Sequence, residues 1–165
     1  MAYSKQGFTE GMTLTHTHLI NMEDGIIAAS NGGLEDLYAS SYGVVPGNVD
    51  TAKMSALLTE ASKNNKTIRF NDGEYIFSST IKVPSNVSLV GNTKTVFKPA
   101  STSLTTLMSM DASDNVFLSH LILDGGLTAR PNAEGTQVGL SMSKVRRVNI
   151  ENVEFKGWSK RGLYA

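Results

Sequence analysis

The period of the hydrophobic pattern changes once in the middle of the chain, near residue 66. Between residues 50 and 65 the apolar residues recur at helical spacing, which predicts an amphipathic helix. Its buried face consists of Met54, Leu57, Leu58 and Ala61. Asp50 or Thr51 can cap the first turn of this helix, and the stretch Asn64-Asn65-Lys66 ends it.

After the helix, apolar residues alternate with polar ones, which predicts short β-strands. The alternating pairs are Ile68 and Phe70, Tyr75 and Phe77, Ile81 and Val83, and Val87 and Leu89. Turn residues at 71–73, 84–86 and 91–92 follow one another too closely for crossover helices between the strands. One helix followed only by short strands indicates a chain that winds into a solenoid.

The second half of the chain contains an internal repeat. Residues 116–125 align with residues 148–157 at a constant offset of 32, and a shorter copy begins 29 residues before the first. In each full copy alternate residues are apolar, with a kink at residues 119–120 or 151–152. Two strands joined by a sharp corner and then repeated predict successive coils of a solenoid, with aliphatic residues stacked inside.

Several short motifs between Tyr42 and Lys98 carry a resemblance to a known family. They are Tyr42-Gly43, Pro46-Gly47-Asn48, Asp50-Thr51, Thr67 to Phe70, Gly73-Glu74-Tyr75 and Val87-Ser88-Leu89-Val90-Gly91. In this order they resemble the beginning of the pectate-lyase-like right-handed β-helix proteins. The chain departs from that pattern at residues 64–66, where the family usually has Gly-Gly, and at residues 71–72, where it usually has Pro. The resemblance implies a mainly β fold, the start of a right-handed parallel β-helix capped by an α-helix.

A second helical pattern lies near the N-terminus, where Thr15 is a candidate N-cap. The apolar residues that follow form a narrow seam of Leu19, Met22, Ile26 and Ala29. So short a helix is unstable alone, so its seam packs either on the chain's own body or in the three-stranded bundle of a homotrimer. Residues 8–26 also resemble a recurrent N-terminal pattern of phage tail and baseplate proteins, which favours the trimer. That pattern is interrupted at Leu19-Ile20-Asn21.

These patterns divide the chain into three parts. Residues 1–35 are expected to form an N-terminal α-helical segment for virion attachment and trimerisation, residues 36–49 a linker, and residues 50–165 the capping helix and first coils of the β-helix. No polar cap is recognisable after the last repeat, although a solenoid needs one to cover its core and its strand edges. We therefore expect this sequence to be the N-terminal part of a longer protein.

Composition excludes several classes of function. The chain has 15 basic and 15 acidic residues, so it has no bulk charge with which to attract nucleic acid or an anionic membrane. It has no Cys, which excludes a disulfide scaffold and a thiolate zinc site. No apolar run approaches the length of a membrane span, and the N-terminus lacks the charged-then-apolar order of a signal peptide.

The residues that carry catalytic or metal-binding chemistry do not combine into a site. His16 and His18 point about 200° apart on the predicted helix start and cannot chelate one ion together. On a strand they would share one face, and in a trimer six such imidazoles could close round a metal ion. The repeat places Asp124 beside Lys156 and an apolar residue beside Glu154, so it pairs no two carboxylates for hydrolysis or lyase chemistry. We assign no catalytic residue, no cofactor and no metal.

Other residues have a structural interpretation beside a functional one. His120 aligns with Asn152 and is expected at a corner of the coil, not as a base. Trp158 is expected to fill a gap between coils, although it could stack on a sugar. The loop at residues 125–135 projects from the coil, either towards a glycan or a neighbouring subunit or into solvent. A solvated basic face is expected at Lys144, Arg146 and Arg147.

Together these observations predict a phage tailspike or appendage protein. The resemblance implies a homotrimer whose N-terminal segment docks on a tail, connector or head-proximal virion protein. Its β-helix would act outside the host and bind, or also degrade, capsule, wall polysaccharide or teichoic acid. Two alternatives stay open: a bacterial or prophage pectate-lyase-like lyase or hydrolase, and a non-catalytic β-helix adhesin. No nucleic-acid partner and no membrane insertion are expected.

Overall fold

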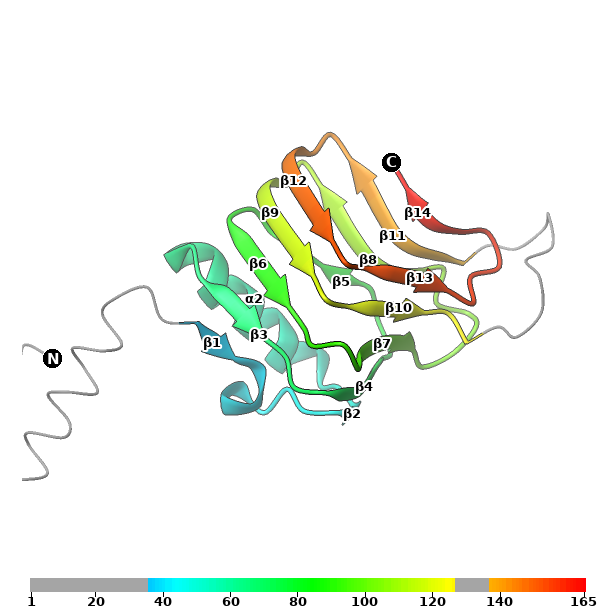
Figure 1. The fold of residues 1–165 in the computed structure, drawn as a ribbon, viewed down its shortest axis with the longest axis horizontal. Helices are drawn as coiled ribbons and strands as arrows, with labels where there is room; N and C mark the ends of the chain where they lie inside the picture. Colours follow the sequence, from blue (N-terminus) through cyan, green and yellow to red (C-terminus); the bar gives the residue numbers. More distant parts are fainter. Residues whose placement is uncertain (1–35, 127–136) are drawn as a thin grey trace, which may run out of the picture. The chain divides into compact units, whose positions relative to one another are not determined.

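The computed structural model describes residues 36–126 and 137–165 (Figure 1). In chain order the elements are β1 (Leu37–Tyr38), the 3-10 helix η1 (Ala39–Tyr42), β2 (Gly47–Asn48), α2 (Thr51–Asn64), β3 (Thr67–Arg69), β4 (Gly73–Phe77), β5 (Ile81–Lys82), β6 (Val87–Val90), β7 (Thr95–Pro99), β8 (Thr106–Asp111), β9 (Asp114–Ser119), β10 (Ile122–Asp124), β11 (Val138–Ser143), β12 (Arg146–Glu151), β13 (Glu154–Lys156) and β14 (Arg161–Tyr164). From α2 onwards this order, one helix followed by short strands, is the order that the hydrophobic pattern predicts.

The strands form three sheets in which every pairing is parallel. The first sheet has the order β1-β3-β6-β9-β12, the second β2-β4-β7-β10-β13 and the third β5-β8-β11-β14. From β3 onwards the chain passes through the first, second and third sheets in turn and then begins again (Figure 1). The described chain is therefore a parallel β-solenoid.

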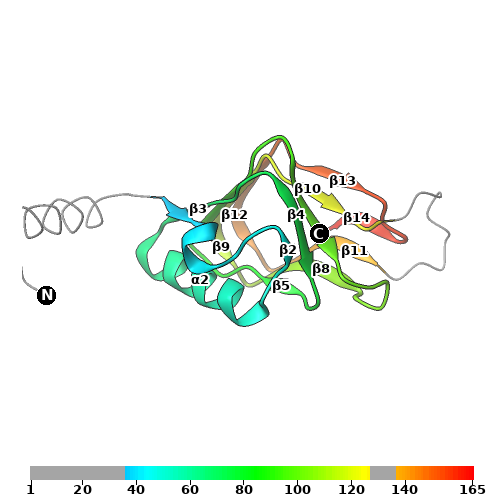
Figure 2. The same ribbon diagram turned by 90° about the horizontal axis from the view of Figure 1, so that it is seen from below.

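Each passage through the sheets is one coil. The first coil contains β1, β2 and α2, and the second contains β3, β4 and β5. The third contains β6 to β8, the fourth β9 to β11 and the fifth β12 to β14. In the first coil α2 therefore stands in the chain where later coils have a strand of the third sheet. It contacts β5, the edge strand of that sheet, and Figure 2 shows the two side by side.

The register between coils confirms the repeat that the sequence predicts. Val116 pairs with Val87 of the preceding coil and with Val148 of the following one. Further along the same coils, Ile122 pairs with Glu154. The predicted offsets of 29 and 32 residues are thus the lengths of two successive coils.

Stacked apolar residues fill the interior of the solenoid. The inward ladders are Ile68, Leu89, Leu118 and Ile150 in the first sheet, Tyr75, Phe97, Leu123 and Phe155 in the second, and Ile81, Met108 and Leu140 in the third. Phe97 is fully buried and lies edge-on to Phe70, Tyr75 and Phe77, with ring centroids 5.0 to 5.5 Å apart. Such edge-to-face pairs add to the energy of burial. The alternating residues predicted to face inwards between Ile68 and Leu89 are all buried.

The predicted limits and buried face of helix α2 are confirmed. The Asp50 carboxylate caps the first turn by accepting a hydrogen bond of 2.8 Å from the Ala52 backbone N–H. Asn65 ends the helix with a φ of 51°, a left-handed conformation that Asn adopts more readily than most residues. The buried face is formed by Met54, Leu57, Leu58 and Ala61. This face lies against β3, β5, β6 and η1.

Residues 36–49 differ from the linker expected there. Leu37 pairs with Ile68 and Gly47 pairs with Tyr75, so β1 and β2 extend the first and second sheets by one strand each. Between them, Ala39 and Val44 are fully buried. This stretch therefore belongs to the first coil of the solenoid.

Candidate functional site

The predicted trimer seam, Leu19, Met22, Ile26 and Ala29, lies outside the described residues. The same holds for His16 and His18 and for most of the loop at 125–135. The surface that the structure describes therefore has to be searched on the faces and corners of the solenoid.

A ladder of alternating charges runs across the second sheet's outer face, where Glu74 lies one row beside Lys98. Lys98 Nζ lies 2.6 Å from Glu74 Oε1 and 3.8 Å from Asp124 Oδ2, and Lys156 Nζ lies 3.9 Å from Asp124 Oδ2. The hydrogen bond that Lys98 donates to Glu74 raises the pKa of Lys98, because it stabilises the charged ammonium. The pairing of Asp124 with Lys156 is the one that the repeat predicts. These four charges satisfy one another and leave no free cation in this ladder.

The corner between the first and second sheets carries His120 and Asn152, as the sequence predicts. Both have left-handed backbones, with φ values of 54° and 52°, which turn the chain sharply from one sheet to the next. Asn152 Nδ2 lies 3.4 Å from His120 Nε2, and Ser119 Oγ lies 2.9 Å from His120 Nδ1. These two contacts hold the imidazole from both sides.

A groove of about 440 Å³ runs along this corner and touches the third, fourth and fifth coils. Its lining residues are Asn92, Thr93, His120, Leu121, Ile122, Asn152 and Glu154. We call it the corner groove. It is within the size range of small-ligand sites, and it offers two amides, a hydroxyl, an imidazole and a carboxylate.

The opposite corner, where the third sheet leads into the first, has its own polar stack. Asn115 Nδ2 donates to Asn86 Oδ1 over 3.1 Å, and Arg147 continues the stack with a φ of 50°. The Arg147 guanidinium binds both oxygens of Asp114, at 2.9 and 2.6 Å, and this lowers the pKa of that carboxyl. One member of the predicted basic face is therefore engaged in a bidentate ion pair.

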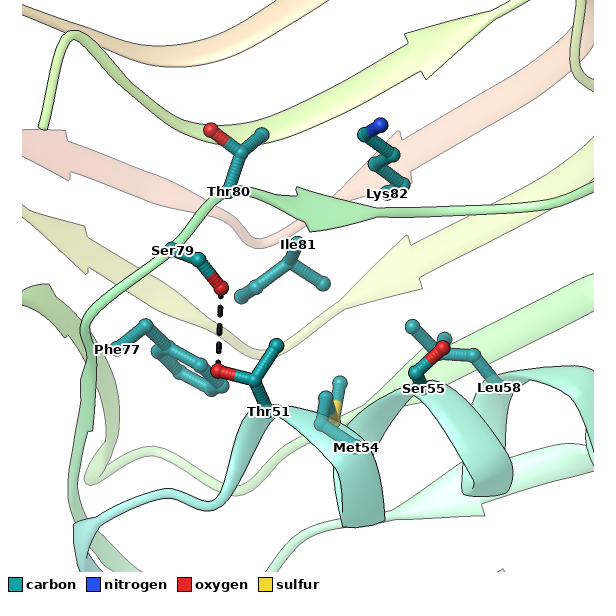
Figure 3. Close-up of a pocket in the computed structure, with 9 residues that line it drawn as sticks. All are labelled: Thr51, Met54, Ser55, Leu58, Phe77, Ser79, Thr80, Ile81 and Lys82. Atoms are coloured by element: carbon teal, nitrogen blue, oxygen red, sulfur yellow. Dashed lines mark hydrogen bonds between the residues drawn. The ribbon is translucent and has the colours of Figure 1, made fainter.

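A second cleft lies between α2 and β5 (Figure 3). It measures about 430 Å³ and is lined by Thr51, Met54, Ser55, Leu58, Phe77, Ser79, Thr80, Ile81 and Lys82. The hydroxyls of Thr51 and Ser79 meet across one end at 3.1 Å. Ile81 points from β5 towards the helix, whereas Lys82 points away from it. The cleft can hold an apolar group, but its lining residues direct no ionisable group into it.

Trp158 fills the gap between coils that the sequence assigns to it. It is 4% exposed, and its indole N–H donates to the Leu123 carbonyl oxygen over 2.9 Å. A Cβ at Gly125 or Gly139 would lie within 3 Å of the ring, so the absence of side chains at these two positions makes room for it. Trp158 is therefore unavailable for stacking on a sugar.

Within the described residues, no three His, Asp or Glu side chains gather where they could hold a metal ion. The ladders there pair acids with bases, serines or apolar residues. Across residues 36–126 and 137–165, no helix is both long enough and apolar enough to cross a membrane. Comparison of the chain with protein-family models, curated proteins and solved structures finds no match.

Proposed function

We propose that this chain is the N-terminal part of a trimeric phage tailspike or appendage protein. In this proposal the fold is the beginning of a right-handed, pectate-lyase-like β-helix. Residues 1–35 trimerise and dock on a tail, connector or head-proximal virion protein. The β-helix binds a polymer of the host surface, such as capsule, wall polysaccharide or teichoic acid, outside the cell.

The observation that carries this proposal is the place of α2 at the start of the solenoid. Sheets one and two begin in the first coil, but the third begins one coil later, because α2 takes the position of its first strand. A helix there covers strand edges and core that the first coil would otherwise expose. The motifs that resemble the β-helix family surround this helix, and the predicted seam precedes it in the chain.

The proposal is tested by the mass of the full chain in solution, measured by light scattering across a concentration series. The unmodified chain is expected to be a trimer. The double variant Met22→Lys and Ile26→Lys places charges in the predicted seam and is expected to be monomeric. The matched control, Thr17→Lys with Asn21→Lys, adds the same charge outside the seam and is expected to remain a trimer. A monomeric unmodified chain, or a trimer in all three proteins, would contradict anchoring by this seam.

A further inference from the structure

The corner groove gathers exposed polar side chains from successive coils. Asn92, Thr93, His120, Asn152 and Glu154 are all exposed and line it from three successive coils. Neighbouring coils are about 4.8 Å apart, so the groove presents a row of polar groups about 10 Å long, parallel to the axis of the solenoid. Ile122, half-buried between these polar groups, supplies an apolar surface.

The walls of the groove are rigid. Thr95 is fully buried, its hydroxyl accepts a hydrogen bond from the Asn92 N–H at 2.8 Å, and it donates to the Asn71 carbonyl oxygen at 3.1 Å. This fixes the turn that carries Asn92. On the next coil, His120 is held between Ser119 and Asn152. A preorganised site loses little conformational entropy when it binds.

The backbone around the groove is not available to a ligand. Strand β9 is paired with β6 and β12, and β10 is paired with β7 and β13. An extended peptide therefore finds no free strand edge here on which to form main-chain hydrogen bonds. Recognition has to use side-chain amides, a hydroxyl and a carboxylate, which together both donate and accept.

The charge of the lining residues further limits the chemical class of ligand that can bind in the groove. Its described lining includes no Lys or Arg, although the exposed Lys94 follows Thr93 in the chain. On the second sheet, Lys98 and Lys156 are paired with Glu74 and Asp124. Glu154 is the one carboxylate among the lining residues. Such a groove disfavours phosphate, sulfate and carboxylate groups.

We propose that the corner groove binds a saccharide segment without acidic groups, lying along the axis of the solenoid. Sugar hydroxyls both donate and accept hydrogen bonds, which matches the mixed amide, hydroxyl and carboxylate lining, and the C–H face of a sugar ring can rest on Ile122. This inference rests on the proposed function, which supplies a host-surface polymer. It narrows that polymer to neutral or amine-bearing units at this site, and it disfavours the phosphate backbone of a teichoic acid there.

The test is a nuclear magnetic resonance titration of the full chain with four trisaccharides at millimolar concentration. Maltotriose, cellotriose and chitotriose are the neutral probes, and trigalacturonate is the acidic probe of equal length. At least one neutral probe is expected to shift the side-chain signals of Asn92, His120 and Asn152, and trigalacturonate is expected to leave them unchanged. The proposal is overturned if no neutral probe shifts these signals, or if the acidic probe binds there more tightly.

A matched pair of variants separates binding from folding. Asn152→Gly removes the groove amide but keeps a residue that accepts φ near 52°, and it is expected to weaken binding of the neutral probe about tenfold. Asn115→Gly makes the same change at the opposite corner, where φ is 56°, and is expected to leave binding unchanged. Equal weakening by both variants would overturn the assignment of the groove.

The two experiments can refute the proposed function and this inference independently of each other. If the seam variants stay trimeric while neutral trisaccharides bind at Asn92, His120 and Asn152, the virion anchor fails and the groove stands. If the chain is a seam-dependent trimer but shows no shifts at these residues, the anchor stands and the groove fails.

Discussion

Substitution of Gly91 by alanine tests the register between the third and fourth coils. An added Cβ there would lie 2.4 Å from the His120 carbonyl oxygen and 2.8 Å from the Thr95 Cβ. The first distance is about 1 Å short of an ordinary van der Waals contact, and the obstacle is backbone, which cannot swing aside. The Gly91→Ala substitution therefore has to push two coils apart.

The expected magnitude is a balance of opposing terms. The φ angle of Gly91 lies outside the left-handed region, so alanine should gain about 0.4 to 1 kcal/mol by reducing the entropy of the unfolded chain. Overpacking costs about 1 to 3 kcal/mol. Separating the coils also strains the 2.9 Å hydrogen bond from Gly91 N–H to the Ser119 carbonyl oxygen, which contributes about 1 kcal/mol. We expect a net loss of about 2 kcal/mol in the free energy of unfolding.

Urea denaturation followed by tryptophan fluorescence measures this loss, because the chain has one Trp and it is buried between coils. Protomer concentration is kept constant, since association would shift the apparent stability. The control is Gly126→Ala, where no atom lies within 4 Å but φ is 79°, so only about 1 kcal/mol of backbone strain is expected. A Gly91→Ala protein as stable as the unmodified chain would refute the register.

Three further predictions concern the core and the ion pairs. Phe97→Ala is expected to lower the free energy of unfolding by about 3 to 5 kcal/mol, measured by urea denaturation, because it leaves a cavity among three aromatic rings. Trp158→Phe is expected to cost about 1 to 3 kcal/mol in thermal unfolding, because it leaves the buried Leu123 carbonyl without its donor. The pKa of Asp114, measured by carboxyl resonance titration, is expected below its usual value and to rise in Arg147→Gln. Since the folded pKa is the lower one, the pair stabilises the fold above the unfolded pKa, near pH 4, and this contribution is lost as the pH falls through the folded value.

The sequence predicts most of the winding because the signals for it are local or repeated. The apolar face of α2 and the alternation from Ile68 to Leu89 follow from spacing alone. The register of β9 and β10 on β12 and β13 follows from self-similarity, since aligned residues stack. The trimer seam stays a prediction, because it lies outside the described residues.

The first coil has neither kind of signal. Strands β1 and β2 have two residues each, too few to show a period, and Tyr38 and Val45 near them are exposed. Their place depends on pairing with β3 and β4, which spacing alone does not reveal. The pair of Glu74 and Lys98 was missed for a related reason: the two are 24 residues apart, and the repeat offsets are 32 and 29.

A left-handed backbone at a corner can be predicted from the sequence only where the residue type favours positive φ angles. Asn86, Asn115 and Asn152 have positive φ values and are of a type that favours such angles. Lys144 and Arg147 also have positive φ values, although nothing in their chemistry predicts it. Their conformation is imposed by the coil, because each follows a corner residue of the preceding coil by 32 positions. Tertiary context thus decides the backbone where local preference is weak.

The positions of the ladders and the corners explain why a recognition site would form at a corner. On the second sheet, Lys98 and Asp124 each contact charged neighbours on adjacent coils, so changing either one disturbs a stack. The side chain of a corner residue is less constrained, because the fold mainly requires that its backbone turns the chain. Asn152 and His120 meet that requirement and still present an amide and an imidazole to solvent. The proposed recognition site therefore lies where side chains can change with less effect on the contacts between coils than on the second sheet.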